Sequence, residues 1–385
     1  MQIFSWSWDV PLTEGGVAED AVANAAMLIL ARESRGITQA ELAEVMTRHS
    51  GETPVSQGYV SKAEAGRLEV TGPRLSLYAT ALGYPAAVLC ADPQVHGVGV
   101  GLVHHRKRAS LGAPALRRIH AELALARMQT RGLLALAGTG HPHRFHRIAV
   151  DDFDTPSDAA STLRREWGLA PGTVPQLIRL IEDAGGLVVV RDLGSRELDA
   201  VTQWIDGDPP LFLVNAHAPA DRFRFSLAHE LGHVIMHGEP GLTGLQERQA
   251  DEFASEFLMP AEAIRAELMR DRLDLPRLLT LKHQWGVSMA ALLRRASTLG
   301  VVTDWHYRNL MVEMSALGYR TQEPSDLERE NPRFIPALVT GLRDGHGHHL
   351  DQLADAAGLL PEEFTRLYPG SGDSTGTPRR RSGDD

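Results

Sequence analysis

Apolar residues recur at helical spacing through the first part of the chain, from residue 21 to residue 92. Side chains three and four positions apart lie on one face of an α-helix, so this pattern predicts several amphipathic helices separated by short polar turns. The run from Ser110 to Leu136 keeps the same period and has no proline after Pro114. It predicts one further, longer helix.

The segment from residue 151 to residue 320 mixes two periodicities. The stretches "GGLVVVRDL" and "PPLFLVNA" are short apolar runs bounded by Gly, Pro or Asn, which is typical of β-strands. The stretches "TPSDAASTLRREWGL" and "VPQLIRLIEDAG" have the period of helices. These patterns indicate a mainly helical α+β protein, with an N-terminal all-α domain joined to a domain that also holds strands.

The same patterns divide the chain into five segments. We expect a helical domain over residues 21–92, a basic helical linker over 94–150, a mixed domain over 151–320, a small C-terminal helical subdomain over 321–370 and a disordered tail over 371–385. The tail is charged and rich in Gly, Ser and Pro, which disfavours a packed core.

The composition is ordinary for a soluble globular protein, with 43% hydrophobic and 23% charged residues in a chain of 385. No apolar run approaches the roughly 20 residues that a membrane-spanning helix needs. The start of the sequence lacks the basic and apolar regions of a secretory signal. The single cysteine, Cys90, excludes an intramolecular disulfide framework. We therefore expect a cytoplasmic protein without membrane contact.

Charge is unevenly distributed along the chain. The formal net charge is -10, yet residues 94–147 hold nine Lys or Arg and a single acid, Glu122. The segment His104–Ser110, "HHRKRAS", is its most basic part. Such a stretch could contact nucleic-acid phosphates, although a solvated linker or an ion-paired face remains an alternative.

The helices expected between residues 21 and 92 have the order of a helix-turn-helix. Thr38 would cap a first helix reaching Val45, and a second helix would begin at Ser56. The exposed positions that we expect to contact DNA are Gln57, Tyr59, Ser61, Lys62 and Arg67. The intervening "TRHSGETP" is long for such a turn, and six basic residues face seven acids, so an interaction or dimerisation module stays open.

The stretch "RFRFSLAHELGHVIMHGEP" carries two histidines, His229 and His233, four residues apart. On a helix this spacing directs both imidazoles to one side, where they could bind the same metal ion. Glu230 follows the first histidine and completes an HExxH motif, in which a carboxylate takes a proton from metal-bound water. Zinc (Zn²⁺) suits imidazole and carboxylate ligands, although an isolated five-residue match also arises by chance.

A third ligand would decide between a metal site and an ordinary helix. The metzincin extension requires Gly and His where this chain has Met236 and Glu239, so that class is excluded. His237 lies one turn beyond His233 and is interpreted as a polar residue at the helix end.

A better third ligand lies downstream, in "QERQADEFASEFLMP". Glu247 could complete a His-His-Glu site, and Asp251, one turn on, could accept a hydrogen bond from a ligand imidazole. The buried stripe of this second helix would consist of Ala250, Ala254, Phe257 and Leu258. Glu252 and Glu256 fall on other faces and are interpreted as solvated acids.

Two family resemblances rest on these residues. "RFRFSLAHELGHVIMH" and "ERQADEFASEFLMP" resemble the ImmA/IrrE family of bacterial metallopeptidases, and the resemblance covers roughly residues 155–320. It implies a zincin-like fold, zinc ligands at His229, His233 and Glu247, and Glu230 as catalytic base. It also implies cleavage of helix-turn-helix transcription regulators. "TQAELA" and "SQGYVSKAEAG" resemble the XRE (Cro/repressor-type) DNA-binding domain.

In zincins, a substrate backbone commonly adds to a sheet edge beside the metal. We expect Leu211–Ala216 to form that edge, with a plain core strand as the alternative.

The function we expect is that of a DNA-binding regulator fused to a zinc endopeptidase, which cuts a transcriptional repressor or a similar protein under stress or in response to mobile DNA. Its partners would be double-stranded DNA and the protein substrate, and a homodimer is left open. One alternative is a non-proteolytic XRE-type transcription factor whose zincin-like domain senses a ligand or acts as a scaffold. Another is the antitoxin of a toxin pair. An intact HExxH disfavours a scaffold, which would not need Glu230.

Overall fold

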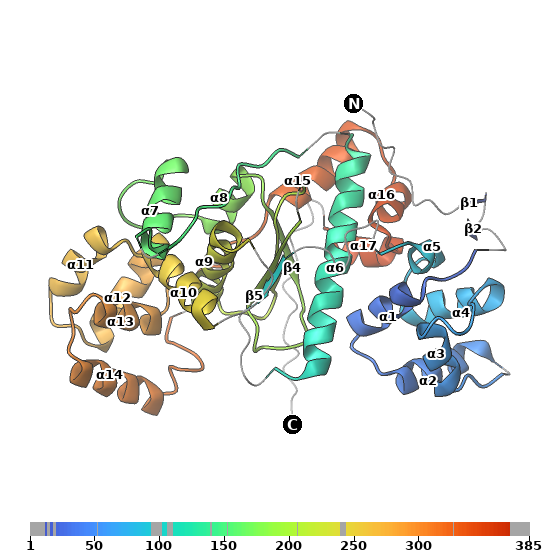
Figure 1. Cartoon of the computed structure of the whole chain (residues 1–385), viewed down its shortest axis with the longest axis horizontal. Coiled ribbons are helices and arrows are strands. Elements are labelled where there is room, and N and C mark those ends of the chain that lie inside the picture. The colour runs from blue at the N-terminus through green and yellow to red at the C-terminus, as the bar shows by residue number, and fades with distance from the viewer. Residues whose placement is uncertain are drawn as a thin grey trace, which may run out of the picture. The chain divides into compact units, whose positions relative to one another are not determined.

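The computed structural model describes residues 12–13, 16–17, 21–51, 53–93, 102–105, 111–138, 141–151, 153–205, 207–238, 244–325 and 327–369. The tail expected over 371–385 and most of the basic stretch His104–Ser110 lie outside these residues. The predicted fold class is confirmed, since the described chain is mainly helical with a few strands (Figure 1). In that part of the chain, none of the helices has the length and apolar character to cross a membrane.

The chain forms two compact units, which we describe separately. The first unit contains residues 1–100, 112–141 and 333–385, and the second contains residues 101–111 and 142–332. Residues 321–332, which we grouped with the C-terminal segment from sequence, lie in the second unit.

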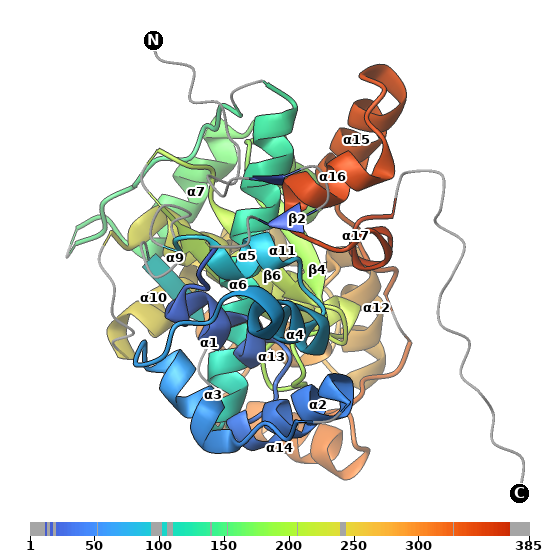
Figure 2. The same cartoon turned by 90° about the vertical axis from the view of Figure 1, so that its right-hand side faces the viewer.

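The N-terminal part of the first unit is a bundle of short helices (Figure 1; Figure 2). They are α1 (Ala25–Ser34), α2 (Gln39–Ser50), α3 (Gln57–Glu64), α4 (Gly72–Leu82) and α5 (Ala86–Cys90), preceded by a small antiparallel pair, β1 (Leu12–Thr13) and β2 (Gly16–Val17). Leu28, Leu42, Val60 and Leu75 each come from a different helix and are buried together with their neighbours. The apolar positions that recur at helical spacing in residues 21–92 are therefore those that form the core of this bundle.

Both predicted starts of the helix-turn-helix are confirmed. The Thr38 hydroxyl accepts from the Glu41 backbone N–H at 3.2 Å, while the Glu41 carboxylate accepts from the Thr38 N–H at 2.7 Å. Ser56 caps α3 through the Tyr59 N–H at 3.1 Å. The length predicted for the connection is wrong, because α2 continues to Ser50 and ends only at Gly51, whose φ is 72°. The link is therefore limited to residues 51–56.

A long helix and the C-terminal segment complete the first unit. They are α6 (Ala113–Leu136), α15 (Phe334–Thr340), a π-helical turn η1 (Gly341–Gly345), α16 (Leu350–Ala357) and α17 (Pro361–Leu367). The expected long helix is confirmed and begins at Ala113. The Tyr368 hydroxyl donates to Gln129 Oε1 of α6 at 2.7 Å, and Arg35 of α1 pairs with Glu363 of α17 at 3.1 Å.

The second unit is built on a four-stranded sheet in the order β3-β5-β6-β4. Its strands are β3 (Leu102–His105), β4 (Leu187–Arg191), β5 (Ala200–Trp204) and β6 (Leu211–Asn215). The β5 strand is antiparallel to both β3 and β6, whereas β4 and β6 are parallel. The prediction that Leu211–Ala216 forms a free edge is wrong, because β6 pairs with a strand on each side. Its backbone N–H and C=O groups already pair with β4 and β5, so they cannot bind a further strand.

Helices cover one face of this sheet and continue beyond it (Figure 1). They are α7 (Pro156–Glu166), α8 (Leu177–Asp183), α9 (Ala220–Met236), α10 (Gly244–Leu258), α11 (Ala261–Met269), α12 (Leu275–Trp285), α13 (Met289–Thr298) and α14 (Asp304–Ala316). Phe212 and Val214 of β6 alternate toward this face and share one core with Ile181 of α8 and Leu227 of α9. The α9 helix therefore packs against this face of the sheet.

A close helix contact in the first unit gives a stability prediction. A Cβ atom at Gly132 of α6 would lie 1.8 Å from the Ala356 carbonyl oxygen of α16. Gly132→Ala should therefore destabilise the unit by about 1–3 kcal/mol, because backbone must move, even though alanine is the better helix former. Thermal unfolding followed by circular dichroism measures the change.

The matched control is Gly58→Ala in α3, where the new Cβ would meet the Ser56 hydroxyl at an ordinary 3.8 Å. This variant should be as stable as the wild type or more stable. A Gly132→Ala protein with unchanged unfolding temperature would show that α6 and α16 do not pack as closely as described.

Candidate functional site

The α9 helix carries the HExxH residues and is buried almost along its whole length. Its apolar side chains face the sheet and neighbouring helices, which is why the sequence shows little polar alternation here. His229 and His233 are both 0% exposed, and Glu230 is 1% exposed. Ionisable side chains that are buried in this way need polar partners.

For the two histidines, carboxylate partners come from α10, which packs closely against α9. A Cβ atom at Gly232, inside the motif, would lie 3.0 Å from the Phe253 ring, so glycine lets the two helices approach. The predicted buried stripe of α10 is confirmed, since Ala250, Ala254, Phe257 and Leu258 are all 0% exposed. The stripe orients the first two turns of α10 so that Glu247 and Asp251 reach the histidines.

Three side chains converge on one point. The Nε2 atoms of His229 and His233 are 3.1 Å apart, and Glu247 oxygens lie 3.6 Å and 3.3 Å from them, respectively. Neighbouring ligands of a tetrahedral zinc ion with bonds of about 2.05 Å are separated by about 3.3 Å. His229, His233 and Glu247 could therefore hold one such ion, with the fourth position open, without rearrangement.

Each imidazole is oriented by a second contact on its other nitrogen. His229 Nδ1 lies 2.9 Å from the Asp251 carboxylate. His233 Nδ1 lies 2.9 Å from Nδ1 of His237, whose Nε2 is 3.1 Å from Gln249 Oε1. The prediction that His237 ends the helix is confirmed, but its side chain is also buried and contacts the second histidine, which residue spacing did not indicate.

The two other acids of α10, Glu252 and Glu256, differ in their exposure to solvent. Glu252 is exposed and accepts from the Ser157 hydroxyl at 2.9 Å. Glu256 was interpreted as solvated, and this is wrong: it is 9% exposed, pairs with Arg295 and accepts from the Ala261 N–H at 3.0 Å. Its partner lies far along the sequence, which is why helix periodicity alone missed the pair.

The three histidines and Glu247 differ in the direction in which their surroundings shift their pKa values. Burial by itself would lower the pKa of His229, but hydrogen bonds to Asp251 and Glu247 outweigh it and raise that pKa to about 9. Burial lowers the pKa of His233, and burial together with His233 lowers the pKa of His237 to about 4. Glu247 is also desolvated, yet the two imidazoles hold its pKa well below its ordinary value.

Comparison with known protein families agrees with this arrangement. A family model described as IrrE N-terminal-like domain matches residues 181–297, which run from α8 through α13. A model described as helix-turn-helix matches residues 28–89. The chain therefore combines an IrrE-like domain with an XRE-type helix-turn-helix domain, which is the architecture of ImmA/IrrE-type proteins. The comparison with curated proteins found no match. The IrrE-like domain is a metallopeptidase-type domain, and its match spans every residue of the His-His-Glu cluster.

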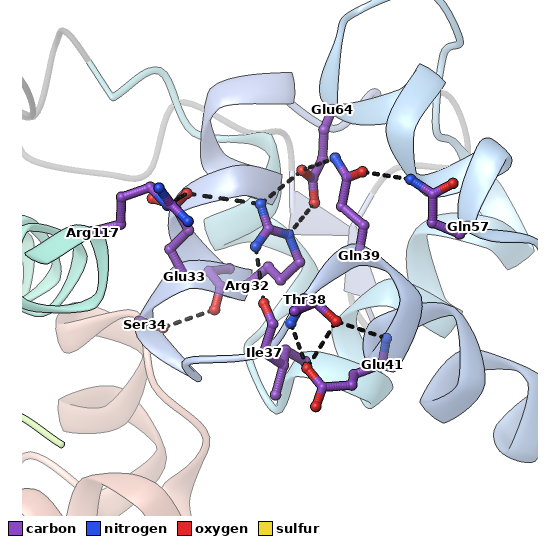
Figure 3. Close-up of polar contacts among 11 residues, drawn as sticks. Arg32, Glu33, Ser34, Ile37, Thr38, Gln39, Glu41, Gln57, Glu64 and Arg117 are labelled. Atoms are coloured by element: carbon purple, nitrogen blue, oxygen red, sulfur yellow. Dashed lines mark hydrogen bonds and ion pairs between the residues drawn. The ribbon is translucent and has the colours of Figure 1, made fainter. Parts of the chain in front are cut away.

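The helix-turn-helix domain has a polar network that joins both ends of α3 to α1 and α2 (Figure 3). Gln57 Nε2 donates to Gln39 Oε1 at 2.9 Å, and Gln39 Nε2 donates to Glu64 Oε2 at 2.9 Å. Glu64 is buried and forms a two-pronged pair with Arg32 of α1 at 2.6 Å and 2.9 Å. The network links α1, α2 and α3, and it fixes the side chain of Gln57 before any ligand arrives.

The residues expected to contact DNA are not equally accessible. Gln57, Lys62 and Arg67 are exposed, whereas Tyr59 and Ser61 are half-buried. The Tyr59 ring lies under the Arg74 guanidinium, 5.0 Å from its centroid, so it also supports the fold. An open groove of about 740 Å³ is lined by Gln57 and also by Arg117 of α6.

The pKa of His229 leads to a prediction about metal binding. A ligand imidazole must be neutral, so below pH 9 a metal ion has to displace the His229 proton. Zinc affinity should rise about tenfold per pH unit between pH 6 and 8, because about one proton is released per ion bound. Asp251→Asn removes the charge that retains this proton, so the pH dependence should flatten near neutral pH.

Calorimetry in buffers of different ionisation enthalpy counts the released protons directly. Glu252→Asn, on the exposed side of α10, is the matched control and should leave the count unchanged. A wild-type affinity that does not change over this pH range would contradict the described charge balance.

Proposed function

We propose that the protein is a zinc-dependent endopeptidase that also binds DNA, and that it cleaves a helix-turn-helix transcriptional repressor or a similar protein in a stress or mobile-DNA response. The observation that carries the proposal is the convergence of His229, His233 and Glu247 beside the buried Glu230. A cytoplasmic location and a homodimer, which would present two reading helices to two half-sites, belong to the same proposal.

The chain's own residues would divide the chemistry between them. His229, His233 and Glu247 would hold zinc, which acidifies a water molecule and polarises the scissile carbonyl. Glu230 is not required as a ligand, so its carboxylate can accept the proton of the attacking water and pass it to the leaving amine. Burial of Glu230 keeps competing bulk water away from that carboxylate.

Binding of duplex DNA is supported by the helix-turn-helix itself and by its exposed side chains. Gln57 stands at the start of α3, the position from which a recognition helix reads base edges, and its amide can pair with adenine. Lys62 and Arg67 would neutralise phosphates, which positions the domain without reading sequence.

The rival to proteolysis is a transcription factor in which the IrrE-like domain senses a ligand or serves as a scaffold. A scaffold needs the metal ligands but has no use for a buried carboxylate at Glu230, since burying a charge is costly. This contrast allows one substitution to separate the two functions.

Glu230→Gln should abolish proteolysis while zinc content and DNA binding stay at wild-type levels, because glutamine keeps the shape of the side chain but is not a base. Loss of a general base typically lowers the rate by about two to four orders of magnitude. Proteins that acquire new N-termini in cells expressing the wild type, but not the variant, identify the substrate by quantitative mass spectrometry.

Glu252→Gln is the control for this experiment, because it makes the same change at an exposed acid of α10. It should cleave as the wild type does. A Glu230→Gln protein that still switches its target genes normally would favour the sensor or scaffold.

Lys62→Ala and Arg67→Ala should each weaken binding to all duplexes and reduce the salt dependence of binding by about one ion released. Gln57→Ala should instead lower the preference for one sequence over others. Fluorescence anisotropy with genomic fragments at several salt concentrations measures both effects. Arg179→Ala, which removes an exposed arginine of α8, is the control. Equal binding by all four variants would favour a protein-interaction module.

A further inference from the structure

His237 is the one histidine of the cluster that the peptidase mechanism does not use. It follows the last residue of α9 and has an extended backbone, with φ -107° and ψ 110°. The end of the helix lets its ring turn back along the last turn, where it lies 4.9 Å from the His233 ring, centroid to centroid. The side chain is buried, with 5% exposure, so its position is set by contacts and not by solvent.

Once His233 Nε2 is taken as the ligand atom, the contacts along the relay assign a proton to one nitrogen of each ring. His233 presents Nε2 to the metal position, 3.1 Å from His229 Nε2, so its own proton belongs on Nδ1. That Nδ1–H donates to Nδ1 of His237 at 2.9 Å, which must then be the acceptor. The His237 proton is therefore on Nε2, and this N–H donates to the side-chain oxygen Oε1 of Gln249 at 3.1 Å. Every donor in this relay meets an acceptor.

We infer that His237 is a positioning residue that holds His233 in its metal-binding tautomer through a relay that ends at Gln249. The inference rests on the proposed function only in taking His233 as a zinc ligand. It predicts an effect on metal affinity, which is measurable whether or not the protein cleaves a substrate.

The two ligand imidazoles would then be supported by different chemistry. His229 has the carboxylate of Asp251 behind it, whereas His233 has a neutral ring followed by a neutral amide. Glu230, Glu247 and Asp251 already bring three carboxylates to the site, and a neutral relay orients His233 without adding a fourth. Added negative charge would reduce the pull of the metal on a carbonyl, so the relay fits a catalytic ion better than a structural one.

The test compares zinc affinity in three variants by competition with a chromophoric chelator. His237→Leu leaves the buried His233 N–H without its acceptor and should weaken zinc binding about 10- to 100-fold. His237→Asn places a carbonyl oxygen near the lost Nδ1 and should recover most of the affinity. Gln249→Leu removes only the end of the relay and should lower the zinc affinity a few-fold. The visible spectrum of the cobalt-substituted protein should change in His237→Leu and return toward wild type in His237→Asn.

His306→Leu is the control for removing a half-buried histidine, because its Nε2 bonds only a remote carbonyl, that of Leu273, at 2.7 Å among the contacts described. Its zinc affinity should equal that of the wild type. If His237→Leu is too unstable to purify, the zinc affinities of His237→Asn and Gln249→Leu still test the relay. Equal losses in His237→Leu and His237→Asn, or wild-type affinity in His237→Leu, would overturn the inference. A wild type that binds zinc but cleaves nothing would refute only the peptidase, and a wild type without zinc affinity would refute both.

Discussion

Two imidazoles from one helix and one carboxylate from another have to meet at a single point, and the second unit is arranged around that requirement. The imidazoles are one turn apart on α9, so their convergence costs nothing beyond helix formation. The carboxylate of Glu247 arrives only if α10 packs against α9 at short range. Gly232 permits that approach, and the apolar stripe of α10 stabilises it.

The α9 helix is also fixed at both ends, which keeps His229 and His233 in place. Near its start, the buried Lys282 of α12 pairs with Asp221 and with Glu323, at 3.1 Å from the latter. Near its end, Arg147 donates to the His233 carbonyl at 3.1 Å and to the next carbonyl along the chain. A metal site needs such support, because ligands that are loosely held lose affinity and catalytic geometry together.

The sequence predicted the parts of this site that depend on helical spacing alone. His229, His233, Glu247 and Asp251 could be proposed because spacings of four residues place side chains on one helix face. The β5 strand escaped prediction because Thr202 and Gln203 are polar yet buried, so the strand shows neither an apolar run nor alternation. Without β5, β6 was taken for an edge. His237 does end α9, as the sequence predicted, but residue spacing could not show that its ring turns back onto His233. Glu256 was misread because its partner Arg295 comes from another helix.

Our central proposal is that the protein holds a zinc ion through two imidazoles and a carboxylate, with one position open. X-ray absorption at the zinc edge of the purified protein tests it most directly. We expect one zinc per chain, four nitrogen or oxygen neighbours at about 2.0–2.1 Å and scattering from two imidazoles. A third imidazole in the shell would make His237 a ligand, and a zinc-free protein would remove the site. Either result would contradict the account.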